Sequence, residues 1–138
     1  MNTNSVSGHH IFIIEDDKYM QHVLNFCLSE TYHTSVFNDG MAAMSALQSG
    51  ELPDLIITDL NTPNLNGLQL LSQIKSSGFF SSIPVIVISG DQSSEKRIQC
   101  LSAGADDYIL KPFNPKELDI RVNIGLKRAG YLYSLKHA

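Results

Sequence analysis

Cysteine, excess positive charge and long apolar segments are all scarce in this sequence, and each scarcity excludes a class of protein. The two cysteines, Cys27 and Cys100, form neither a disulfide framework nor a C-x-x-C pair, so we expect buried, reduced thiols and a cytoplasmic chain. The formal net charge of −4 gives no overall basic character for binding nucleic acid or an anionic membrane. No apolar run approaches the roughly 18 residues of a membrane-spanning helix, and the polar residues 1–10 lack the apolar core of a secretion signal.

Apolar residues make up 43% of the 138 positions, which suits a single domain with a substantial core. We expect residues 1–9 to form a disordered tail and residues 10–128 to form the folded domain. Residues 129–138 are expected to be a C-terminal extension or the start of a helical linker. They are too few for a second domain. The chain is expected either to act alone by binding a partner or to belong to a longer protein, and the apolar residues of this segment favour the second alternative.

Short apolar runs alternate with amphipathic segments along the chain. The runs at 11–14 and 85–88 are apolar throughout, which is typical of strands buried on both faces. The segments between the runs carry apolar residues at the spacing of helices. We predict five strands and five helices: strands at about residues 11–14, 34–37, 55–59, 85–88 and 107–110, and helices at about residues 17–28, 41–48, 67–77, 93–101 and 115–128. This alternation predicts an α/β fold with a parallel sheet and helices on both faces.

The last predicted helix has apolar residues at every second position of its first half. Pro115 suits the first turn of a helix, where its missing N–H group is not needed. We expect the inner face to contain Leu118, Val122 and the Ile120–Ile124 pair, and the helix to end near Arg128.

Polar side chains follow four of the predicted strands. Glu15 and Asp16 follow the first strand, Asp59 ends the third, and Ser89 and Lys111 follow the fourth and fifth. Because crossovers in a parallel sheet bring all strand carboxyl ends to one edge, we expect these side chains to lie together. Carboxylates that crowd one another repel, and a divalent cation with oxygen ligands, Mg²⁺ or Mn²⁺, would offset the repulsion.

This set of residue types suits phosphoryl transfer. Asp59 would be the nucleophile, Ser89 a hydroxyl donor and Lys111 a mobile cation for phosphate oxygens. Each residue alone also has an ordinary explanation, since strand-end acids and serines often cap helices and a lysine before proline is common in surface loops. The joint occurrence at four strand ends is what favours a functional site.

Four segments closely resemble the motifs of the receiver domain of two-component response regulators, the CheY-like family. Residues 13–17 are similar to the acidic pocket of that family, and residues 59–67 follow its D-x-x-M-P-x-x-x-G phosphoacceptor pattern. Residues 87–90 match its switch hydroxyl, and residues 104–113 match its G-A-x-D-Y-x-x-K-P-F end. The resemblance covers about residues 11–128 and implies a doubly wound, flavodoxin-like (βα)5 fold with strand order 2-1-3-4-5.

The resemblance assigns roles to residues that match the motifs. It implies that Asp59 accepts a phosphoryl group from a phosphohistidine. Asp16, Asp59 and the backbone carbonyl of Asn61 would bind Mg²⁺, with Glu15 acting on the metal, and Lys111 would hold phosphoryl oxygens.

The resemblance further implies a regulatory switch rather than an enzyme with a substrate of its own. Ser89 would also hold the phosphoryl group and, with Tyr108, would move on phosphorylation to change the face of the fourth helix, fifth strand and fifth helix. We predict that this face includes Lys96, Arg97, Tyr108 and Lys116. Expected partners are a sensor histidine kinase or histidine phosphotransfer protein, and a downstream protein or an output domain outside this chain. Nucleic acid and membrane are not expected partners, and a homodimer is left open.

The sequence departs mildly from the pattern of the family. Thr62 replaces the usual methionine, Ser89 replaces the commoner threonine, and Asn66 stands where aspartate is usual. None of these changes removes a catalytic group. The family also has a cis peptide bond at the position of Lys111–Pro112.

Two other functions share some of these features. A small aspartyl-phosphate phosphatase of the haloacid dehalogenase type also uses a strand-end aspartate, a hydroxyl, a lysine and Mg²⁺. Its motif requires a second aspartate two residues after the nucleophile, whereas Asn61 occupies that position and cannot shuttle a proton. A flavodoxin-like FMN-binding protein shares the fold, but acidic residues at the strand ends would repel the flavin phosphate.

Overall fold

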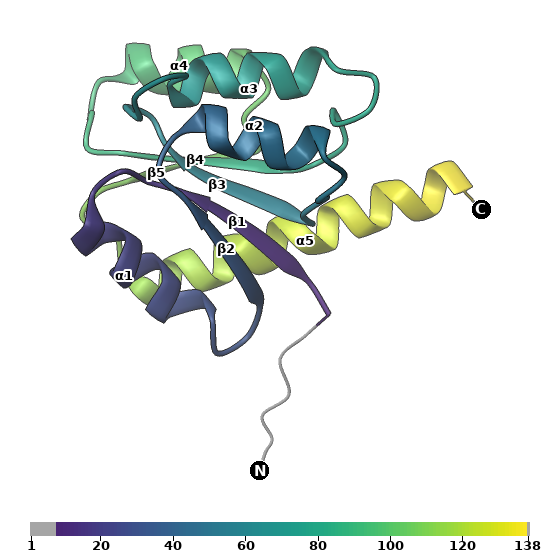
Figure 1. Ribbon diagram of the computed structural model, residues 1–138, viewed down its shortest axis with the longest axis horizontal. Helices are drawn as coiled ribbons and strands as arrows, with labels where there is room; N and C mark the ends of the chain where they lie inside the picture. The colour runs from purple at the N-terminus through teal and green to yellow at the C-terminus, as the bar shows by residue number, and fades with distance from the viewer. Residues whose placement is uncertain (1–7, 138) are drawn as a thin grey trace.

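A five-stranded parallel sheet lies between two layers of helices (Figure 1). The computed structural model describes residues 8–137; the tail expected over residues 1–9 therefore lies mostly outside the described residues. The strands are β1 (His10–Ile14), β2 (His33–Phe37), β3 (Leu55–Asp59), β4 (Val85–Ser89) and β5 (Asp107–Leu110). They pair in the order β2-β1-β3-β4-β5, which confirms both the α/β class and the predicted strand order.

Five helices connect and cover the strands. They are α1 (Lys18–Leu28), α2 (Gly40–Gln48), α3 (Gly67–Ser76), α4 (Ser94–Ser102) and α5 (Pro115–His137). Helices α2, α3 and α4 lie on one face of the sheet, and α1 and α5 lie on the other (Figure 1). The first four helices begin where a side chain accepts a hydrogen bond from a free backbone N–H group, namely at the caps Asp17, Asp39, Asn66 and Ser93.

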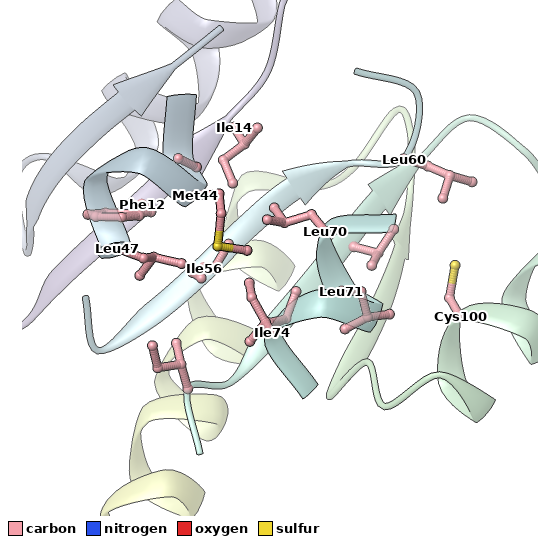
Figure 2. Packing of buried hydrophobic residues seen from close by; sticks show 14 of the residues in the cluster. Phe12, Ile14, Met44, Leu47, Ile56, Leu60, Leu70, Leu71, Ile74 and Cys100 are labelled. Carbon is pink, nitrogen blue, oxygen red and sulfur yellow. The ribbon is translucent and has the colours of Figure 1, made fainter. Parts of the chain in front are cut away.

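Alternate residues of the central strands fill two separate cores. Phe12 and Ile14 of β1 pack beneath α2 and α3 with Leu70 and Ile74, as Figure 2 shows. The intervening Ile11 and Ile13 point to the opposite face, toward α1 and α5. Each such fully buried side chain contributes about 1.5–3 kcal/mol relative to an exposed one. Burial on both faces explains why residues 11–14 and 85–88 are apolar and why charged groups appear only at the ends of these strands.

Two expectations from composition can be compared with the fold. Cys100, on the inner side of α4, is buried in the core and Cys27 is half-buried on α1, and both are free thiols. Within residues 8–137, no helix combines the length and the apolar character needed to cross a bilayer.

Helix α5 differs from its prediction in both inner face and length. Leu118, Val122 and Leu126 are buried, at i, i+4 and i+8, whereas Ile120 and Ile124 are 49% and 47% exposed. The prediction that Ile120 and Ile124 belong to the inner face is therefore wrong. A side chain two residues further along a helix points to the opposite side, so Ile120 and Ile124 point away from the side of Leu118 and Val122. The helix also continues past Arg128 to His137, and its last turns extend beyond the sheet (Figure 1).

The two faces of α5 predict different responses to truncation. We expect Leu118→Ala to lower the free energy of unfolding by about 2–5 kcal/mol, since it opens a cavity in the core. Ile120→Ala on the opposite face should change it by less than about 1 kcal/mol. Urea unfolding followed by circular dichroism measures both, and similar losses in the two variants would contradict this assignment of faces.

Candidate functional site

The candidate site lies at the carboxyl edge of the sheet, where β1 and β3 are neighbours. Ile14 pairs with Thr58, so the next residues, Glu15 and Asp59, lie side by side. Ser89 ends the adjacent β4, and Lys111 directly follows β5. Ligands of open α/β sheets bind at this kind of position, where strand connections leave in opposite directions.

Lys111 joins two of the acids directly. Its Nζ lies 2.6 Å from Oδ1 of Asp59 and 3.0 Å from Oε1 of Glu15. Both carboxylates are buried, at 8% and 2% residue exposure, so an unpaired charge on either would be strongly unfavourable. The other oxygen of Asp59, Oδ2, accepts a hydrogen bond of 2.9 Å from the backbone N–H of Asn61. Both oxygens of Asp59 are therefore held by donors.

Burial and ion pairing act in opposite directions on the pKa values of Glu15 and Lys111. Burial raises the pKa of Glu15, and hydrogen bonds from the Asp17 backbone and from Lys111 offset only part of that rise. Burial by itself would lower the pKa of Lys111, but its hydrogen bonds to Asp59 and Glu15 outweigh burial and leave that pKa raised. The lysine is therefore held in its charged form.

Three carboxylates gather into a cluster that can hold a metal ion. One oxygen each from Glu15, Asp16 and Asp59 lies within 4.8 Å of the others, with Asp16 exposed and the other two buried. An all-oxygen set of this kind suits a hard divalent cation such as Mg²⁺ or Mn²⁺ rather than zinc. Exposed Asp16 gives the ion a route from solvent. The residues present therefore fit the metal that the sequence predicted.

Ser89 and Tyr108 meet at a different point, the backbone of Asp91 in the loop between β4 and α4. The Ser89 Oγ atom is fully buried and accepts a hydrogen bond of 3.0 Å from the Asp91 N–H group. The hydroxyl of Tyr108 donates a 2.9 Å hydrogen bond to the Asp91 carbonyl. The structure thus brings together Glu15, Asp16, Asp59 and Lys111, and links Ser89 to Tyr108 through one loop residue.

Sequence reasoning missed several contacts around the loop after Asp59. Asn64 donates to Asp39, and the buried hydroxyl of Thr62 donates to the carbonyl of Leu65. The replacement of methionine by Thr62 was visible in the sequence, but its partner was not. The Lys111–Pro112 peptide bond is cis, as the resemblance implied.

Residues 11–123 match the protein family described as response regulator receiver domain. The chain is 38% identical over 114 residues to the transcriptional regulatory protein KdpE of Staphylococcus aureus, covering 83% of this chain and 48% of that protein. It is 37% identical over 122 residues to the sensor histidine kinase TmoS of Ectopseudomonas mendocina, covering 87% of this chain and 12% of that protein. The chain spans about half, or less, of the length of these curated relatives.

Solved structures agree with this match over most of the chain. The receiver domain of Francisella response regulator 1452 superposes with a TM-score of 0.81 and 34% identity, covering 88% of this chain and 98% of that one. The receiver domain of the sensor histidine kinase PA1611 of Pseudomonas aeruginosa superposes with a TM-score of 0.80 and 26% identity, covering 88% and 99%. That protein has a magnesium ion coordinated in its active site cleft.

The raised pKa of Glu15 predicts a pH-dependent stability in metal-free protein. The folded state binds the Glu15 proton more tightly than the unfolded chain does, so the associated stability is present at acidic pH and is lost as pH rises through the raised pKa. We expect Glu15→Gln to melt at a higher temperature than wild type at pH 8, with the difference shrinking toward pH 5. Melting curves in a chelator measure this, with Glu51→Gln, at an exposed site, as the control. A Glu15→Gln variant less stable than wild type at pH 8 would contradict the expected sign.

Proposed function

The chain belongs to the response regulator receiver domain family of two-component systems, and from this membership we propose that it accepts a phosphoryl group from a phosphohistidine onto Asp59. The observation that carries the proposal is the contact of this strand-end carboxylate with Lys111 beside two further acids. Receiver domains are regulatory, so the proposed transfer serves a switch rather than the turnover of a metabolite.

The proposed transfer depends on a divalent cation, Mg²⁺ or Mn²⁺. Asp16, Asp59 and the backbone carbonyl of Asn61 would hold it, with Glu15 acting on the metal. When bound, the ion offsets the repulsion among the carboxylates and neutralises charge on the incoming phosphoryl group. The carboxylate cluster supports this assignment, as does the magnesium ion in the related receiver domain of PA1611.

Asp59 would act as the nucleophile. One of its oxygens forms a bond to phosphorus while the bond from phosphorus to the imidazole nitrogen of the donor histidine breaks, leaving an acyl phosphate and a free histidine. Lys111 already contacts this carboxylate at 2.6 Å, so a short movement would bring its ammonium group onto a phosphoryl oxygen. Ser89 would donate its hydroxyl to another phosphoryl oxygen.

Phosphorylation would be transmitted through the loop that holds Asp91. If the Ser89 hydroxyl turns toward the phosphoryl group, it gives up the hydrogen bond from the Asp91 N–H group. The Asp91 carbonyl is the acceptor for Tyr108, so the two switch residues are coupled through one peptide segment. The proposed result is a population shift in the face formed by α4, β5 and α5, which would include Lys96, Arg97, Tyr108 and Lys116.

The proposed partners follow from this mechanism. A sensor histidine kinase or a histidine phosphotransfer protein would supply the phosphoryl group, and a downstream protein or an output domain would recognise the changed face. The phosphatase alternative has less support, because Asn61 offers an amide where that chemistry needs a carboxylic acid.

Labelling with a small phosphoryl donor tests the proposal. We expect acetyl phosphate and Mg²⁺ to add one phosphoryl group to wild type, detected by intact-protein mass spectrometry, and Asp59→Asn to abolish the addition. The matched control is Asp17→Asn, which keeps the cap of α1 and should leave labelling intact. Undiminished labelling of Asp59→Asn would refute the assignment, and repeated turnover of small phosphate esters by wild type would favour the phosphatase.

A further inference from the structure

The loop between β3 and α3 contains backbone conformations that its residues rarely adopt. Asn64 has φ 57° and Leu65 has φ 133°. The first value is tolerated by asparagine, but the second is strongly disfavoured for a branched side chain such as leucine. Strained residues of this kind persist only where surrounding contacts hold them, and they concentrate at functional sites. This loop begins one residue after Asp59.

Thr62 holds the strained residue from inside the loop. Thr62 is 4% exposed, and its Oγ1 donates a 3.0 Å hydrogen bond to the carbonyl oxygen of Leu65. That same oxygen lies against Gly40 at the start of α2, where an added Cβ would come within 2.4 Å of it. The Leu65 carbonyl therefore fits between a buried hydroxyl and a position that only glycine leaves open.

Two further contacts close the loop. The Asn64 side chain donates a 3.0 Å hydrogen bond to Oδ2 of Asp39, the residue whose other oxygen caps α2. At the end of the loop, the Gly67 N–H group donates to the carbonyl of Leu60 at 2.9 Å. The segment from Leu60 to Gly67 is thus fixed from within and tied to α2.

We infer that Thr62 is a positioning residue that sets the Asn61 backbone for binding of the divalent cation. Asn61 precedes Thr62 directly, and its N–H group already donates to Oδ2 of Asp59. The inference rests on the proposed function, in which the Asn61 carbonyl is a metal ligand. Because the Thr62 hydroxyl holds the loop in the metal-free protein, the ion does not have to order this backbone when it binds.

Magnesium affinity is the direct test of this role. We expect Thr62→Val to raise the Kd for Mg²⁺, measured by isothermal titration calorimetry, by about 3- to 10-fold, which is the effect of losing one ordinary hydrogen bond. Thr62→Ser restores the hydroxyl and should bind within about twofold of wild type. The matched control is Thr34→Val, which makes the same side-chain change at a half-buried threonine bonded to Asn25, and should also leave the Kd within about twofold.

Amide hydrogen exchange in chelator gives a readout that does not involve metal. Thr62→Val should increase exchange at the Gly67 amide, which closes the loop, while amides in the middle of β3 keep wild-type rates. Gly40→Ala disturbs the same Leu65 carbonyl from the other side and should also weaken Mg²⁺ binding, so the inference stays testable if Thr62→Val folds poorly.

The outcomes separate the inference from the function on which it rests. Wild-type affinity in both Thr62→Val and Gly40→Ala would overturn the positioning role while leaving the proposed function intact. Failure of the proposed function would appear in wild type itself, as absence of Mg²⁺ binding and of labelling at Asp59, and the inference would fall with it.

Discussion

The candidate site depends on one interaction, the ammonium group of Lys111 held between the buried carboxylates of Asp59 and Glu15. Without it, two neighbouring acids would be buried with nothing to balance their charge. With it, three carboxylates including Asp16 face one ammonium group and leave an excess of negative charge, which suits a divalent cation. The same lysine can move to a phosphoryl oxygen, so one residue serves both the resting site and the proposed phosphorylated one.

The topology of the sheet allows Lys111 to contact Asp59 and Glu15. Because the central strands are covered on both faces, their interiors are apolar except for Thr58, whose hydroxyl donates to the carbonyl of Asp59, and charged groups are confined to the strand ends. The parallel order places β1 beside β3 and brings β5 to the same edge. Charged side chains that would be unfavourable in the interior of the central strands therefore meet at one edge of the sheet, and that edge forms the site.

The departures from the usual receiver pattern acquire a physical meaning in the structure. Asn66 replaces an aspartate but still caps α3, accepting from the Gln69 N–H group in a reciprocal capping box. Thr62 stands where methionine is usual, and its hydroxyl donates a hydrogen bond to the carbonyl of Leu65. Ser89 keeps the hydroxyl of the usual threonine and contacts Asp91. Each of the three residues makes a hydrogen bond that holds the backbone in a loop or helix start near the site.

The sequence by itself determined the five strands, the five helices apart from the end of α5, and the acids at the strand ends, because these follow from local periodicity and from motifs of adjacent residues. It could not assign the inner face of α5, since Leu118 and Ile120 are equally apolar and only the docked sheet distinguishes them. It predicted that Lys111 would lie near Asp59 and Glu15, but not that its ammonium group would bind both carboxylates directly across 52 and 96 residues of sequence. Those contacts were decided by the tertiary structure, because only the packed sheet brings distant strand ends within hydrogen-bonding distance.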